Sequence, residues 1–144
     1  MAFMEWSRDL SIGIPIFDDE HKRLLGMINT LHDSIENGTQ AAALKRIENE
    51  LIEYTIVHFR HEEMYFDDFA YPQAKEHQAH HAEMKKRVFA FREEIEHNAS
   101  DEVSRRLLQC LRDWLADHIL IEDKKFGAFL CARGYGADKA RPFR

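Results

Sequence analysis

Histidines and carboxylates recur in this sequence at the spacing of one helical turn. His58 is followed four residues later by Glu62, and His77 is followed four residues later by His81. Residues four apart on an α-helix are offset by only about 40°, so the two members of each pair would face the same way. Imidazole nitrogens and carboxylate oxygens that converge in this manner are typical metal ligands. The two pairs therefore make a metal site the first hypothesis.

Two more histidines, His21 and His118, interrupt apolar stripes elsewhere in the chain. A single histidine on an apolar face is more often a hydrogen-bonded core residue than a ligand, and for either residue alone that alternative stays open. Together the residues favour a metal, because each buried polar group without a partner costs roughly 2–7 kcal/mol. Five imidazoles and a carboxylate in the interior of one helical bundle predict a bound cation.

The ligand types narrow the choice of metal. Imidazoles and carboxylates without thiolate suit iron, manganese or zinc, and the set is too large for one tetrahedral zinc ion. Two metal ions fit better. Ferritin-like di-iron proteins use repeated Glu-x-x-His pairs, whereas here one such spacing occurs, Glu94 to His97, without a mate. A histidine-rich pair of irons tends toward mild, reversible redox chemistry.

Glycine and proline divide the chain into four segments with helical periodicity. We expect helices over residues 18–37 and 41–69, a third from beside Pro72 to Ile95, and a fourth that begins after Ser100 and Asp101. The apolar stripe of the fourth should run through Val103, Leu107, Cys110, Trp114, His118 and Ile121. Short connections between helices of this length predict an all-α fold, an antiparallel up-down-up-down four-helix bundle.

The ends of the chain lack this periodicity. Residues 1–17 carry Trp6, Ile12, Ile14 and Ile16, which we expect to form an N-terminal arm packed on a bundle of residues 18–132. Residues 133–144 read as a basic, flexible tail. Cys110 and Cys131 lie on the same expected helix, roughly 30 Å apart at about 1.5 Å per residue, so no disulfide can join them within it.

Composition limits the class of protein. The 144 residues are 44% hydrophobic and 32% charged, and they carry a formal net charge of -6. These values are typical of one globular domain and disfavour nucleic acid or an anionic membrane as a partner. Glu5 and Asp9 stand where a signal peptide would be apolar, so we expect a cytoplasmic protein.

Other titratable residues fall beside the apolar stripes or near helix ends. Asp19 and Glu20 sit in the first turn of a helix, where negative charge is favourable without any metal. We expect the following residues to be solvated and not to bind metal: His32, His61, Glu63, His80 and His97.

In order along the chain, a set of short motifs resembles the bacterial haemerythrins over about residues 6–131. The motifs are EWS with Trp6, DDEH ending at His21, HFRHEE, YPQAKEHQAHH and WLADHILIED. Each is weak alone, but their joint order is specific. One departure is Glu20, where the family often has glutamine.

The resemblance implies a di-iron centre with a bridging oxo or hydroxo group. By it, one iron binds His77, His81 and His118, the other binds His21 and His58, and Glu62 and Asp123 bridge the two. The two-histidine iron would keep an open position, where the family holds dioxygen as hydroperoxide.

The function implied is reversible dioxygen binding for carriage, storage or delivery, without catalysis, with an oxygen-consuming enzyme or a reductase as a possible partner. The alternatives are a di-iron redox enzyme, such as an oxidase, peroxidase or nitric-oxide scavenger, and an oxygen or redox sensor.

Asp123 is assigned by this resemblance alone. It follows His118 by five residues, and on a regular helix the two side chains would point about 140° apart. A π-type bulge between them would bring both inward, and such bulges often mark functional sites. The resemblance also suggests Leu24, Phe59 and Leu115 as the wall of an oxygen pocket, with plain core packing as the alternative.

Overall fold

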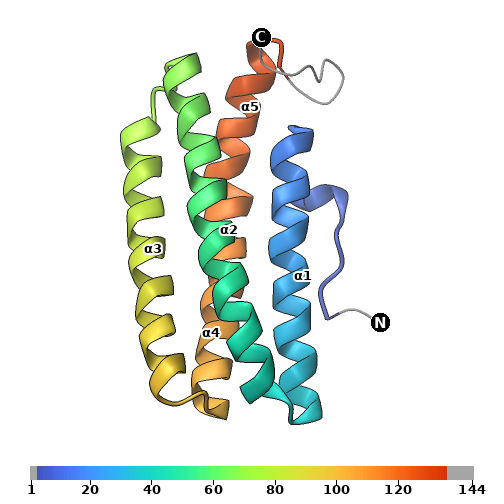
Figure 1. Ribbon diagram of the computed structural model, residues 1–144. Coiled ribbons are helices and arrows are strands. Elements are labelled where there is room, and N and C mark those ends of the chain that lie inside the picture. The colour runs from blue at the N-terminus through green and yellow to red at the C-terminus, as the bar shows by residue number, and fades with distance from the viewer. Residues whose placement is uncertain (1–2, 136–144) are drawn as a thin grey trace.

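The computed structural model of the protein describes residues 3–135, and these form helices and connecting segments without any strand (Figure 1). The elements in order are η1 (Arg8–Leu10), α1 (Pro15–Asn37), α2 (Gln40–Phe69), α3 (Ala74–His97), α4 (Asp101–Trp114), the π-helix η2 (Leu115–Asp123) and α5 (Lys124–Ala132). The last three follow one another without a break and make a single long rod. The chain therefore has four rods, as the sequence predicted.

The rods pack along their apolar stripes. α1 lies against α2 and α4, and α2 lies against α3. Short connections join successive rods, so neighbours run in opposite directions (Figure 1). The central core buries side chains from all four rods, among them Leu24, Leu51, Met84 and Leu111. These observations confirm the four-helix bundle.

Local signals at the helix ends behave as their residue types predict. Gly38 ends α1 in the left-handed region, with φ of 73°, and the Thr39 amide then donates to the Ser34 carbonyl at 2.9 Å. The Ser100 hydroxyl accepts a hydrogen bond from the Val103 amide at 3.2 Å and caps α4. α1 begins at Pro15 and not at residue 18, because proline suits the first turn of a helix.

Residues 12–14 of the N-terminal segment pack against α5. Ile12 and Ile14 are buried there beside Phe126, in a second, smaller core. At Gly127 the backbones meet so closely that a Cβ atom would stand 2.0 Å from the Ile12 carbonyl oxygen. Asp18 closes the turn by accepting a hydrogen bond from the Ile12 amide at 2.9 Å. The arm is therefore held by backbone contact as well as by apolar burial.

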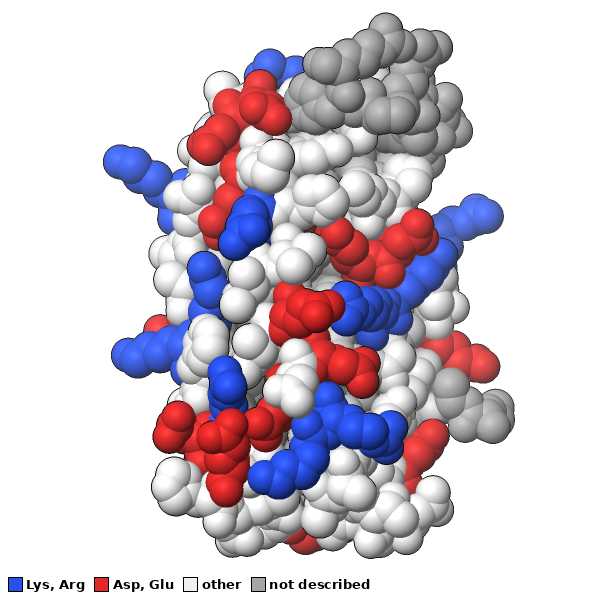
Figure 2. All heavy atoms as spheres, in the orientation of Figure 1, with Lys and Arg blue, Asp and Glu red and all other residues white. Residues whose placement is uncertain are grey.

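The chain ends, the cysteines and the surface were also the subject of predictions. Residues 136–144 lie outside the described part of the chain, and with them most of the expected tail. No disulfide joins Cys110 to Cys131, both of which are described. Within residues 3–135 no helix is apolar and long enough to cross a membrane. The face drawn in Figure 2 carries acidic and basic side chains interspersed, which gives nucleic acid no continuous basic surface there.

Candidate metal centre

The helix-spaced pairs of the sequence face the interior of the bundle. His58 and Glu62 project from α2, and His77 and His81 project from α3. His21 on α1 joins them at the same level. Each of these side chains is at most 3% exposed. The prediction that three rods contribute inward histidines at one level is confirmed.

The fourth rod contributes His118 and Asp123 because it is locally a π-helix. Hydrogen bonds in a π-helix join residues five apart, so residues with that separation lie one above the other. His118 is 3% exposed and Asp123 is fully buried, as the bulge hypothesis requires. The same geometry corrects one prediction: Ile121, expected on the inward stripe, is 50% exposed, because the wider turn rotates it to the surface.

The seven side chains form two groups that share both carboxylates. Glu62 and Asp123 combine with His77, His81 and His118 in one group, and with His21 and His58 in the other. Within each group the candidate ligand atoms all lie within 4.8 Å of one another. We call these groups the three-histidine position and the two-histidine position. A shared pair of carboxylates between them is the arrangement of a dinuclear centre.

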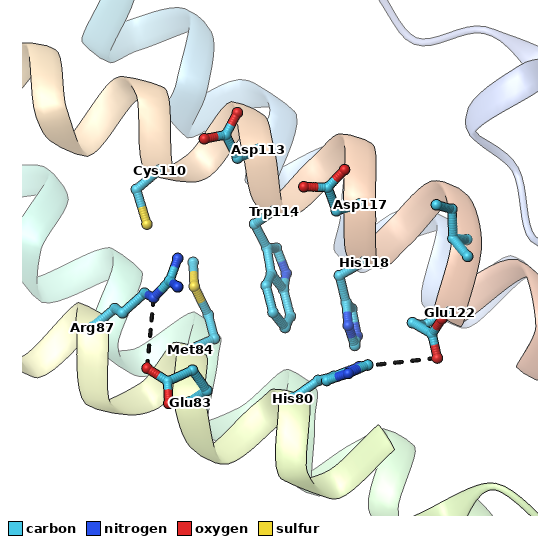
Figure 3. Close-up of a pocket in the computed structure, with 11 residues that line it drawn as sticks. His80, Glu83, Met84, Arg87, Cys110, Asp113, Trp114, Asp117, His118 and Glu122 are labelled. Atoms are coloured by element: carbon cyan, nitrogen blue, oxygen red, sulfur yellow. Dashed lines mark ion pairs between the residues drawn. The ribbon is translucent and has the colours of Figure 1, made fainter. Parts of the chain in front are cut away.

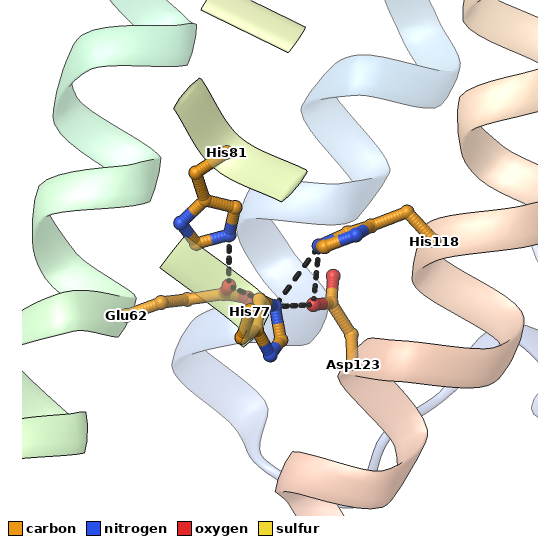
Figure 4. A group of neighbouring side chains, drawn as sticks. All are labelled: Glu62, His77, His81, His118 and Asp123. Carbon is orange, nitrogen blue, oxygen red and sulfur yellow. Dashed lines mark hydrogen bonds and ion pairs between the residues drawn. The ribbon is translucent and has the colours of Figure 1, made fainter. Parts of the chain in front are cut away.

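The two oxygens of each carboxylate divide between the positions. At the three-histidine position, Glu62 Oε1 is 3.0 Å from His81 Nε2, and Asp123 Oδ1 is 2.8 Å from His77 Nε2 (Figure 4). At the two-histidine position, Glu62 Oε2 is 3.3 Å from His58 Nε2 and Asp123 Oδ2 is 3.0 Å from His21 Nε2. Each carboxylate thus presents one oxygen to each position, as a bridging ligand does.

The buried polar atoms have too few partners within the protein. Both oxygens of Glu62 and of Asp123, both ring nitrogens of His21 and Nε2 of His81 have no hydrogen-bond partner among the described residues. His77 Nε2 and His118 Nε2 point at one another at 2.9 Å. Orphaned acceptors that converge on a point are costly unless a cation takes them up. The donor set therefore fits metal ions.

The charges of the site point the same way. Burial acts to raise the pKa of Glu62, but the charge of His58 and contacts with three histidines hold it well below its ordinary value. Burial and the charge of Glu62 act to raise the pKa of Asp123, but the neighbouring histidines His118 and His21 lower it below its ordinary value. Burial acts to lower the pKa of His58, yet Glu62 and Glu20 raise it to about 10. Both carboxylates are therefore ionised, and without metal they draw protons onto nearby histidines.

Comparison with known proteins agrees with this geometry. The model of the Hemerythrin HHE cation binding domain matches residues 12–130. The chain belongs to the haemerythrin family. Bacteriohemerythrin of Pseudomonas paraeruginosa is 36% identical over 85% of this chain and 78% of its own length. Bacteriohemerythrin of Methylococcus capsulatus is 32% identical over 92% of this chain and all of its own. A crystal structure of wild-type hemerythrin superposes with a TM-score of 0.76 at 26% identity, and it covers 90% of this chain and 98% of the other.

Two carboxylates of this haemerythrin hold the ligand imidazoles from behind. Glu20 accepts a hydrogen bond from His58 Nδ1 at 2.6 Å and another from His61 Nδ1 at 2.7 Å. Glu63 accepts one from His81 Nδ1 at 2.8 Å. Such bonds fix the tautomer that leaves Nε2 free for a metal and raise the basicity of the ligand.

Sequence reasoning missed this role of Glu20 and Glu63, which it treated as a helix-terminal charge and a solvated residue. Glu63 is in fact 29% exposed and bonded to His81. Both contacts join different helices, so no local spacing signals them. The expectation that His61, His80 and Glu63 are not ligands agrees with the two groups, neither of which includes them.

Aromatic rings cover two ligand imidazoles of this haemerythrin. Phe59 stacks on His81 with ring centroids 3.9 Å apart, and Trp114 stacks on His118 at 3.8 Å. Trp114 and His80 also line a surface groove of about 280 Å³ between α3 and the fourth rod, beside His118 (Figure 3). His118 itself lines that groove, next to the indole ring.

The three residues suggested for an oxygen pocket lie together in the central core. Leu24, Phe59 and Leu115 are 1%, 2% and 2% exposed. All three belong to the same hydrophobic cluster, and each comes from a rod that also supplies a ligand. All three therefore belong to the packed core, and their assignment to an oxygen pocket stays a prediction.

Proposed function

We propose that this haemerythrin binds dioxygen reversibly at two iron ions, for carriage, storage or delivery. One observation carries the proposal: the two positions have unequal ligand sets but share both carboxylates. Three histidines and two carboxylate oxygens converge on one position, whereas two histidines and two carboxylate oxygens converge on the other. The ions would be held by His77, His81 and His118 on one side and by His21 and His58 on the other.

The unequal sets leave room for a ligand on one side only. With one further bridging oxygen, the three-histidine position would have six ligands and the two-histidine position five. Mixed imidazole and carboxylate ligands with an open position suit iron that reacts with oxygen. Bound iron ions would supply the electrons that dioxygen takes up on binding and returns on release.

The residues of the chain have three tasks in this function. Glu20 and Glu63 orient His58 and His81 so that Nε2 of each points inward. Glu62 and Asp123 hold both positions at a fixed separation. Leu24, Phe59 and Leu115 keep water from the open position, which favours release of oxygen unchanged over its conversion by proton transfer.

The pocket favours a binding protein over an oxidase or peroxidase. An enzyme of that kind needs room for a second substrate beside the open position. The three pocket side chains leave little such room, because each is almost completely buried. This is the specific observation that ranks the carrier above the enzyme.

The absorption spectrum of the iron-loaded, reduced protein tests the proposal. It is recorded without air, in air, and again after the oxygen has been removed. We expect a visible band that appears with oxygen and disappears on its removal, over several cycles. Irreversible oxidation in the first exposure to air would contradict the carrier function and favour a redox enzyme or a sensor.

Adjacent histidines provide a matched control. Substitution of His81, which is fully buried and faces Glu62, should abolish the reversible band. His80→Ala changes a neighbouring side chain that is 49% exposed, and it should retain the band.

A further inference from the structure

Tyr54 has a buried hydroxyl with which no described residue forms a hydrogen bond. Its side chain is 4% exposed, and the hydroxyl oxygen has no hydrogen-bond partner among the described residues. A buried tyrosine hydroxyl usually finds a partner, and one left without any is costly. Phenylalanine would fill this space in the core equally well. The hydroxyl therefore points to a partner other than the described residues, such as a bound ligand.

Its position places it beside the two-histidine position. Tyr54, His58 and Glu62 follow one another at intervals of four residues on α2 and share its inward face. The ring of Tyr54 stacks on the ring of His58, with centroids 5.1 Å apart and planes 10° apart. His58 is one of the two histidines of that position. Tyr54 thus packs directly on a histidine of the position where the proposed function requires an open site.

The Tyr54 hydroxyl is able to donate. A tyrosine hydroxyl carries one O–H donor, and this one has no hydrogen-bond partner among the described residues. The neighbouring core residues Leu24, Phe59 and Leu115 have no hydrogen-bonding side chains, so they cannot take the role.

We propose that the Tyr54 hydroxyl donates a hydrogen bond to a small ligand bound at the two-histidine position, either dioxygen or a monoanion such as azide. The inference rests on the proposed function, which supplies the open position. It adds a residue that sets affinity and selectivity for ligands able to accept a hydrogen bond. Tyr54 keeps its proton throughout and takes no part in electron transfer.

Azide is a suitable probe, because it binds to oxidised iron and reports on the hydrogen bond without the oxygen cycle. The iron-loaded, oxidised full chain is titrated with azide and followed by its charge-transfer absorption. Tyr54→Phe should raise the dissociation constant about tenfold or more, the factor expected for one hydrogen bond to a charged ligand. Equal dissociation constants for the variant and the wild type would overturn the proposal and leave Tyr54 as core packing.

Tyr65→Phe is the matched control. It makes the same change on the same helix, but this hydroxyl is bonded to the hydroxyl of Tyr135 at 3.0 Å. We expect its azide affinity to stay within about twofold of wild type. A weakening as large as that of Tyr54→Phe would mean that α2 responds to any such change, and it too would overturn the proposal.

Two measurements keep the test independent of folding and of oxygen binding. The metal-free Tyr54→Phe protein should unfold at the wild-type temperature or above it, because the hydroxyl makes no hydrogen bond with the described residues that the change could remove. If the variant fails to load iron, the wild-type azide adduct is compared in H2O and D2O, after exchange in the metal-free state. A shift in its vibrational frequency supports the donor, and no shift contradicts it.

The two proposals fail differently. If the oxygen band is irreversible but Tyr54→Phe still weakens azide, the donor stands and the carrier function does not. If oxygen binds reversibly and azide affinity is unchanged, only the donor fails.

Discussion

The carboxylates behind the ligands offer a test that separates the two metal positions. Glu20 bonds to a histidine of the two-histidine position, and Glu63 bonds to one of the three-histidine position. Glu20→Ala should therefore weaken metal binding at the first position only, and Glu63→Ala at the second only. Each change removes the acceptor for an imidazole N–H whose ring is at most 3% exposed.

The size of the effect follows from these contacts. An unsatisfied buried donor costs about 1–3 kcal/mol, and loss of a carboxylate behind a metal-bound histidine typically lowers affinity about tenfold to hundredfold. The two estimates agree, since each factor of ten corresponds to about 1.4 kcal/mol. We expect one of two bound metal ions to dissociate ten to a hundred times faster in each variant.

Release of iron from the reduced, loaded protein to a chelator measures this effect. Wild-type protein should release both ions slowly, and each variant should show one fast phase of half the amplitude. Asp19→Ala is the matched control, because Asp19 neighbours Glu20 but is 76% exposed and pairs with Lys22 at the surface. A Glu20→Ala protein that releases metal like Asp19→Ala, or loses both ions together, would refute the reasoning.

Further predictions concern a close backbone contact, the protonation of two ligand histidines and a helix cap. Gly127→Ala should lower the free energy of unfolding by about 1–3 kcal/mol, measured by denaturant titration, because the new methyl would collide with the Ile12 carbonyl. Burial acts to lower the pKa of both His58 and His77, but Glu62 and Glu20 raise that of His58 to about 10, and Asp123 and Glu62 raise that of His77 to about 9. Metal loading at pH 8 should therefore release about two protons to an indicator dye, one from each histidine. By the same shifts, their contribution to metal-free stability is complete below pH 6.5 and lost as the pH rises through 9 to 10. Ser100→Ala should cost about 1 kcal/mol in thermal unfolding, as the α4 cap is lost.

The part of the fold that depends on periodicity was predictable. Stripes with spacings of three and four residues predicted four rods, and glycine and serine marked helix ends at Gly38 and Ser100. The start of α1 was placed late, since Pro15 was counted with the arm although proline suits a first helical turn.

The candidate site was predictable only in part. Six of its residues lie on regular helical spacings, whereas Asp123 needed the resemblance, because regular geometry turns it away from His118. Ile121 was misplaced for the same reason. Glu20, Glu63 and Tyr54 act across helices or toward a ligand, and a single sequence holds no local sign of such contacts.

The π-helix also decides which way the end of the chain faces. A π-bulge amounts to one surplus residue in a helix, which shifts every later residue by about 100° around the axis. Phe126 and Leu130 are fully buried in the smaller core against the arm only with that shift in place. Deletion of one residue within η2 would restore a regular α-helix and turn both side chains away from Ile12 and Ile14. The surplus residue that brings the Asp123 carboxylate to the centre thus also determines where the N-terminal arm packs on α5. A change in the π-helix would affect both the centre and the arm.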